Sequence, residues 1–171
     1  LSEEERSEVI GEMPVDDLVD ALDELSEAEQ ERIIADLEEE EAEDVRELRQ
    51  YEPDSAGGMM TSEFLAAPLG ATSGEALATI QGNLNAEVIS YVYVISGEGQ
   101  LKGVVSIRTL LKARPETAVE EYMETDIVKV EVETDREEVA AVVDKYNLPV
   151  IPVVDSNDSI RGIVTFDDVL D

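Results

Sequence analysis

Apolar residues in the last part of the chain follow two different periods. Residues 127–132 alternate apolar and polar side chains, which predicts a half-buried strand, and the continuous apolar run 148–154 predicts a buried strand. A helix is expected between them, and a further strand over 160–164 leads to a helix that opens at Thr165. The pattern therefore predicts a β-α-β-β-α unit.

The same unit occurs twice. The sequence Gly-Val-Val-Ser-Ile-Arg-Thr-Leu-Leu at 103–111 is matched 59 positions later by Gly-Ile-Val-Thr-Phe-Asp-Asp-Val-Leu at 162–170. Met60 and Met123 each precede the first strand of a copy. The apolar strand expected at 91–95 in the first copy corresponds to the apolar run 148–154 in the second. A repeat of this length is one supersecondary unit that needs its neighbour.

The first third of the chain has a helical pattern instead. Apolar residues recur at helical spacing, and Ser26 with Glu29 forms a capping box. We expect short antiparallel helices that dock on the rest, because about fifty residues bury only a marginal core alone. The expected domains are an acidic helical N domain over 1–52, a first repeat with its lead-in over 53–118 and a second repeat over 119–171.

Acidic residues dominate the composition. The chain has 43 acidic and 12 basic residues, a net charge of −31 and a pI near 4.1. This charge excludes a nucleic-acid partner, because phosphate binding needs the opposite sign. We assign most of the acid excess to solvation, as in a halophilic protein from a very salty cytoplasm.

The chain contains no cysteine and no histidine. Thiolate and imidazole metal sites and disulfides are therefore excluded, and any metal must be held by oxygen, which favours Mg²⁺ or Ca²⁺. No run of about 20 apolar residues and no signal peptide are visible. Because the chain begins with Leu1 and stops at Asp171, seven residues into its last helix, we expect a fragment that is also shortened at the N domain.

The doubled signature Gly-apolar-apolar-Ser/Thr-x-x-Asp resembles the CBS domain, which occurs in pairs and regulates an attached protein. The lead-in Tyr-Glu-Pro-Asp-Ser-Ala-Gly-Gly-Met-Met-Thr at 51–61, the Tyr-Val-Tyr at 91–93 and the segment 164–171 extend the resemblance to the cytosolic part of MgtE-type magnesium transporters. This resemblance implies an α+β fold, with a tandem CBS domain pair preceded by a small all-α helical domain. It also implies a homodimer formed through the CBS domains, a transmembrane pore domain of the same protein as partner, and a place at the cytoplasmic face of the cell membrane.

The resemblance further implies a Mg²⁺ sensor. In this family, Mg²⁺ bound between acidic N-domain residues and the second CBS unit holds the cytosolic dimer compact and the pore shut. The matching positions are Asp168, Asp171, Asp135 and Glu137, with Gly57 through its carbonyl, and Glu12 and Asp16 align more loosely.

Helix capping is the alternative role for two of these acids. Thr165 with Asp168, and Thr134 with Glu137, have the spacing of an N-cap and the third helical residue. Asp168 and Asp171 also lie three positions apart, so they share one helical face and could present their carboxylates together.

An adenine nucleotide such as ATP or AMP is the alternative ligand. CBS pairs commonly offer the Ser or Thr of the signature to phosphate and its Asp to ribose, but the first copy has Thr109 at the Asp position. Resemblance to MgtE-type proteins that bind ATP near this copy assigns the nucleotide to Tyr91, Arg108 and Leu148. Core packing for Leu148 and a surface ion pair for Arg108 are the alternatives.

Catalysis is the third class of function. Without histidine or cysteine it needs paired carboxylates, a lysine or a tyrosine in a cleft, and the convergent acids here lie at helix starts. No Gly-rich phosphate loop is present. We therefore expect a regulatory module and no enzyme.

Overall fold

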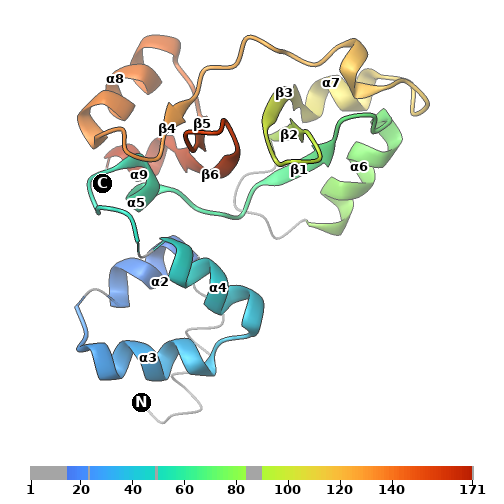
Figure 1. Ribbon diagram of the computed structural model, residues 1–171. Helices are drawn as coiled ribbons and strands as arrows, with labels where there is room; N and C mark the ends of the chain where they lie inside the picture. The colour runs from blue at the N-terminus through green and yellow to red at the C-terminus, as the bar shows by residue number, and fades with distance from the viewer. Residues whose placement is uncertain (1–14, 23, 49, 84–89, 171) are drawn as a thin grey trace.

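A computed structural model describes residues 15–22, 24–48, 50–83 and 90–170. Within these residues, the N domain consists of α2 (Val15–Leu22), α3 (Glu27–Asp36) and α4 (Glu39–Leu48). These helices form a separate layer below the rest of the chain (Figure 1). The predicted capping box at the start of α3 is confirmed, because Ser26 accepts from the amide of Glu29 and the Glu29 carboxylate accepts from the amide of Ser26. Leu18, Leu22, Ile34 and Val45 are buried between these helices.

Each repeat forms a three-stranded sheet with two helices. The first contains β1 (Leu65–Pro68), α6 (Ser73–Gly82), β2 (Tyr91–Ile95), β3 (Leu101–Ser106) and α7 (Ile107–Lys112). The second contains β4 (Val130–Glu131), α8 (Arg136–Tyr146), β5 (Val150–Val154), β6 (Ile160–Thr165) and α9 (Phe166–Leu170), after a short 3₁₀ turn η1 (Val119–Glu121). In both sheets the first strand runs parallel to the second and the second antiparallel to the third. The predicted β-α-β-β-α unit and the α+β fold class are confirmed.

Three local predictions in the second repeat were wrong. The strand expected over 127–132 is reduced to β4, which pairs with β5 only through Val130 and Glu131, and β5 begins at Val150 instead of residue 148. The N-cap of α8 is Asp135, whose Oδ1 accepts from the Glu138 amide at 2.9 Å. The expected Thr134–Glu137 capping box does not form, because the Thr134 hydroxyl accepts from the Glu131 amide.

The segment just before the first strand of each repeat, here called its lead-in, lies on the sheet of the other repeat. Thr61 exchanges two backbone hydrogen bonds of 2.9 Å with Ile163 of β6, and Glu124 pairs in the same way with Val104 of β3. The signature glycines make room for this crossing, since a Cβ on Gly162 would lie 2.8 Å from the sulfur of Met60. Gly103 and Met123 repeat this contact in the first repeat.

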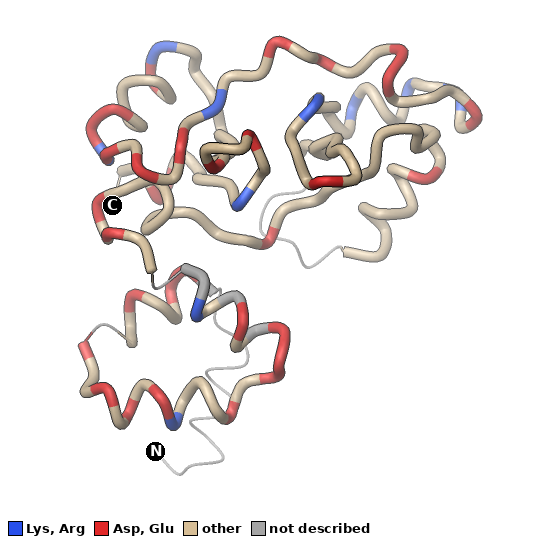
Figure 2. The backbone as a smooth tube through the Cα atoms, viewed as in Figure 1, with Lys and Arg blue, Asp and Glu red and all other residues tan. Residues whose placement is uncertain are grey.

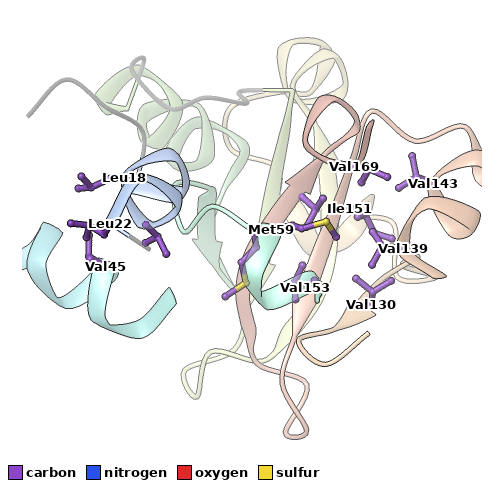
Figure 3. Close-up of a cluster of buried hydrophobic side chains, with 14 of the residues drawn as sticks. Leu18, Leu22, Val45, Met59, Val130, Val139, Val143, Ile151, Val153 and Val169 are labelled. Atoms are coloured by element: carbon purple, nitrogen blue, oxygen red, sulfur yellow. The ribbon is translucent and has the colours of Figure 1, made fainter. Parts of the chain in front are cut away.

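The buried apolar residues connect the N domain with the second repeat. One continuous cluster joins Leu18 and Leu22 of α2 and Val45 of α4 to Met59, and through it to the valines and isoleucines of the second repeat. Figure 3 shows Met59 between the two groups of side chains. The first repeat has its own core, and a third cluster lies between the two sheets. The N domain is therefore packed against the second repeat by apolar contact.

Candidate functional site

The segment from residue 50 to 60, here called the linker, is hydrogen-bonded to the second repeat. The amide of Ala56 donates to the Thr134 carbonyl at 2.7 Å, and the amide of Gly57 donates to the Val132 carbonyl at 2.9 Å. In the other direction, the amide of Arg136 donates to the Asp54 carbonyl at 2.8 Å. The linker thus runs along the segment that leads into α8, and this contact region together with the start of α9 is called the junction below.

Local sequence explains the shape of the linker. Ser55 caps the one-turn helix α5 (Ala56–Met59) by accepting from the amide of Gly58 at 3.1 Å. The two glycines allow the chain to fold back on itself, because a Cβ on Gly57 would lie 2.5 Å from the ring of Tyr51. A Cβ on Gly58 would collide with the Glu52 carbonyl. Gly57 is buried, with its amide already used to bind the second repeat.

Asp135 and Asp168 both take part in helix capping at the junction. Asp135 caps α8, as described above. Asp168 accepts from the Thr165 hydroxyl at 2.8 Å, and its amide donates to the same hydroxyl oxygen at 3.3 Å. The spacing of Thr165 and Asp168 predicted this capping pair. Glu137 is exposed in the first turn of α8.

The side chain of Arg136, at the start of α8, contacts both the linker and α9. Its Nε lies 3.6 Å from Oδ1 of Asp54 in the linker, and its Nη1 donates to the backbone carbonyl of Asp168 at 3.5 Å. One side chain therefore reaches from α8 to both the linker and α9. The sequence did not single out Arg136 or Asp54, because only the fold brings their segments together.

The predicted metal ligands do not gather into a ready-made metal site in the described part of the chain. Asp135, Glu137, Asp168 and Gly57 lie at the junction, whereas Asp16 is almost fully buried in the first turn of α2. Glu12 and Asp171 lie outside the described residues. Among the described residues, no three acidic side chains converge closely enough to hold a metal ion. Acidic positions are instead spread over the N domain and both repeats (Figure 2).

A second candidate site is an apolar pocket of about 160 Å³ between the two repeats. Tyr91 and Tyr93 of β2 line one side, and Leu148 and Pro152 of the second repeat line another. The pocket is further lined by Val104, Glu124, Asp126, Ile127, Val128 and Val150. Of the predicted nucleotide residues, Tyr91 and Leu148 face this pocket, whereas Arg108 is exposed on α7 and is not among the lining residues.

Three of the pocket residues that the sequence did not single out have polar side chains: Tyr93, Glu124 and Asp126. Tyr93 follows Tyr91 at the strand period of two, so the alternation could have found it. Burial, with a smaller effect of Tyr91, raises the pKa of Tyr93 above its usual range, so its phenol stays neutral. Glu124 and Asp126 enter from the crossing lead-in of the second repeat. Apolar walls with two phenols and two carboxylates suit a flat aromatic ligand whose hydroxyl or amino groups donate hydrogen bonds.

None of the helices in the described ranges combines the length and the hydropathy that crossing a bilayer requires.

The family profile of the MgtE intracellular N domain matches residues 1–54, and the profile of the CBS domain matches 56–116 and 119–171. The magnesium transporter MgtE of Thermus thermophilus is 46% identical over 129 residues, which cover 75% of this chain and 29% of that protein. The magnesium transporter MgtE of Bacillus subtilis is 37% identical over 160 residues, which cover 93% of this chain and 36% of that protein. The chain thus spans about a third of the length of these curated relatives.

A crystal structure of the cytosolic domain of the Mg²⁺ channel MgtE, in complex with ATP, superimposes with a TM-score of 0.90 at 39% identity. The superposition covers 99% of this chain and 75% of that one. Both the N domain and the CBS pair are therefore matched, in sequence and in structure. The chain belongs to the MgtE family of magnesium transporters and contains the intracellular N domain and the CBS pair of that family.

Proposed function

We propose that this chain is the regulatory part of a magnesium transporter and that it senses Mg²⁺ without catalysing a reaction. In this proposal, Mg²⁺ bound between acidic surfaces of the N domain and the second repeat favours a compact state in which the attached pore is closed. The observation that carries the proposal is the attachment of the linker to the second repeat. This attachment couples the position of the N domain to the starts of α8 and α9, where three of the predicted ligands, Asp135, Glu137 and Asp168, lie, while the fourth, Gly57, lies in the linker itself.

Electrostatics gives a physical reason for such a response. Residues 1–54 hold 23 acidic and 4 basic residues, net −19, and residues 55–171 hold 20 and 8, net −12, so the two parts repel each other. An ion shifts a conformational equilibrium only if it binds one state more tightly than the other. Since no three described acids converge, the proposed ligand set includes Glu12 and Asp171 in addition to the residues at the junction.

A Mg²⁺ titration at high, constant KCl tests the proposal, because general screening is then already saturated. Small-angle scattering should show compaction that saturates with Mg²⁺. Asp168→Asn should weaken this compaction, whereas Asp144→Asn, in the last turn of α8, should leave it unchanged as a matched control. Equal compaction in the unmodified chain and in Asp168→Asn would remove Asp168 from the ligand set. If Mg²⁺ produced no specific compaction of the unmodified chain, the proposed function would be contradicted.

We also propose that the chain acts as a homodimer through its CBS pair, attached to a pore domain at the cytoplasmic face of the cell membrane. Two exposed leucines support a self-association face. Leu111 on α7 and Leu170 on α9 are 70% and 69% exposed, and each lies on the helix that closes a repeat. Equilibrium sedimentation of the chain and of a Leu111→Glu variant tests this part, because a charged side chain at a dimer interface should shift the equilibrium toward monomers.

Binding of an adenine nucleotide is the second candidate function, and the pocket between the repeats favours it. Tyr91 and Leu148 offer surfaces for a base, and a solved MgtE cytosolic domain that is 39% identical is in complex with ATP. In this proposal Arg108 contacts the phosphates. A ligand at 100 times its dissociation constant stabilises a protein by about 2.7 kcal/mol, so ATP or AMP should raise the melting temperature. The rise should be lost in Leu148→Trp, which fills the pocket, while an unchanged rise would exclude this site.

A further inference from the structure

Arg136 occupies an unusual position for a basic residue. It is the first residue of α8, where the positive end of the helix dipole disfavours a positive charge. The described segments that meet at the junction, residues 50–60, 130–141 and 165–170, contain nine acidic residues and one basic residue, which is Arg136. A position that is unfavourable for its own helix is thus combined with a strongly acidic environment.

The contacts of Arg136 use the geometry of a guanidinium group. Nε faces the carboxylate of Asp54 in the linker, and Nη1 faces the carbonyl of Asp168 in α9. Two separate nitrogens therefore reach two separate elements, which the single nitrogen of a lysine cannot reproduce. The Arg136 side chain is 35% exposed and Asp54 is 90% exposed, so each contact is worth little by itself and depends on ionic strength.

We propose that Arg136 is a built-in cation of the junction, which ties the linker and α9 to α8 when no divalent ion is bound. No three of the described acids converge closely enough to hold a metal ion, and the positive charge of Arg136 lies among them. A divalent cation that binds to the carboxylates of the junction has to do so beside this charge and is repelled by it. The second consequence, which rests on the proposed Mg²⁺ sensing, is that Arg136 raises the Mg²⁺ concentration needed for the response.

Hydrogen exchange at the linker tests the first part in the 171-residue chain, with EDTA and constant KCl. The amides of Ala56 and Gly57 report directly on the linker, because their acceptors belong to the second repeat. Arg136→Gln should speed their exchange about two- to fivefold, the range expected for losing a partly exposed ion pair. Arg161→Gln is the matched control, since it removes an equal charge that pairs with Asp155 in the β5–β6 hairpin, and it should leave both amides unchanged.

Two further variants keep the test decisive. Asp54→Asn removes the same ion pair from its exposed side and should also speed exchange, even if Arg136→Gln folds poorly. Arg136→Lys should restore only part of the protection. Exchange in Asp54→Asn and Arg136→Gln that equals the unmodified chain would overturn the proposal.

A Mg²⁺ titration of the same amides tests the competition. Arg136→Gln should reach half of its maximal protection at a severalfold lower Mg²⁺ concentration than the unmodified chain. If Arg136→Gln needed the same or a higher Mg²⁺ concentration, the proposed competition between Arg136 and Mg²⁺ would be contradicted. Faster exchange of the variants in EDTA, with no response to Mg²⁺ in any of them, would support the contacts proposed for Arg136 and contradict Mg²⁺ sensing. Failure of the Arg136 proposal and failure of the proposed function therefore give different results.

Discussion

The thioether of Met60 packs against Gly162, although Met60 stands before the first strand of one repeat and Gly162 lies in the last strand of the other. A Cβ at position 162 would lie 2.8 Å from the Met60 sulfur and 2.6 Å from the Thr61 carbonyl oxygen. Met123 and Gly103 form the equivalent pair. The methionine and the glycine that mark the two ends of each repeat in the sequence are therefore contact partners between repeats.

Gly162→Ala should destabilise the CBS pair, because the added methyl group collides with a backbone oxygen that cannot move freely. Overpacking of this kind costs about 1–3 kcal/mol. Urea unfolding followed by circular dichroism should show the loss as a lower midpoint. Gly97→Ala is the control, since nothing lies within 4 Å of a Cβ at that position, and an equal loss in both variants would contradict the contact.

A single repeat should not fold as a monomer. A chain limited to residues 53–118 loses the strand partner that Glu124 provides to Val104, and its own Thr61 has no Ile163 to pair with. We expect it to be unfolded or to self-associate, and to gain structure when residues 119–171 are added. Amide chemical-shift dispersion in NMR spectra of each piece and of the mixture measures this, and a well-dispersed spectrum from a monomeric single piece would refute it.

Leu22→Ala should destabilise the N domain by about 2–5 kcal/mol, because Leu22 is 1% exposed and its truncation leaves a cavity. Leu25, three residues later, is 37% exposed, so Leu25→Ala should cost less. Urea unfolding of both variants gives the comparison. Similar losses at the two positions would place the core of the N domain differently from the structure.

Stability should fall at strongly alkaline pH, in part because of Tyr93. Burial raises its pKa above the ordinary value of 10.0, so between that value and the higher folded-state pKa the phenol ionises only in the unfolded chain. The contribution of Tyr93 is complete below about pH 10 and is lost as the pH rises above it. Tyr93→Phe should flatten the fall of the melting temperature between pH 9 and about pH 11, whereas exposed Tyr146→Phe should not.

The fold was largely predictable because its signals are local. Strand and helix periods gave the β-α-β-β-α order of each repeat, and the Ser26–Glu29 and Thr165–Asp168 spacings correctly indicated helix starts. The boundary errors near β4 also have a local cause. Asp135 and Thr134 are adjacent residues that can both cap a helix, and Asp135 caps α8. The length of β4 depends on its pairing with β5, which includes two residues of β4, Val130 and Glu131.

The candidate sites were less predictable because they combine segments that are distant in the sequence. Composition and resemblance pointed to acids at the starts of α8 and α9, but no local pattern reveals that Arg136 lies beside Asp54. The carboxylates of the pocket were missed for the same reason, since Glu124 and Asp126 reach it only because the lead-in of the second repeat crosses to the first sheet.

The crossing of the lead-ins has a consequence for how the CBS pair holds together. Two unconnected repeats would have to find each other in solution, and their association would depend on protein concentration. Residues 113–118, between α7 and η1, join the repeats covalently and turn that encounter into an intramolecular step with a high effective concentration. The duplicated chain therefore carries its obligatory partner with it, and dilution cannot separate the two.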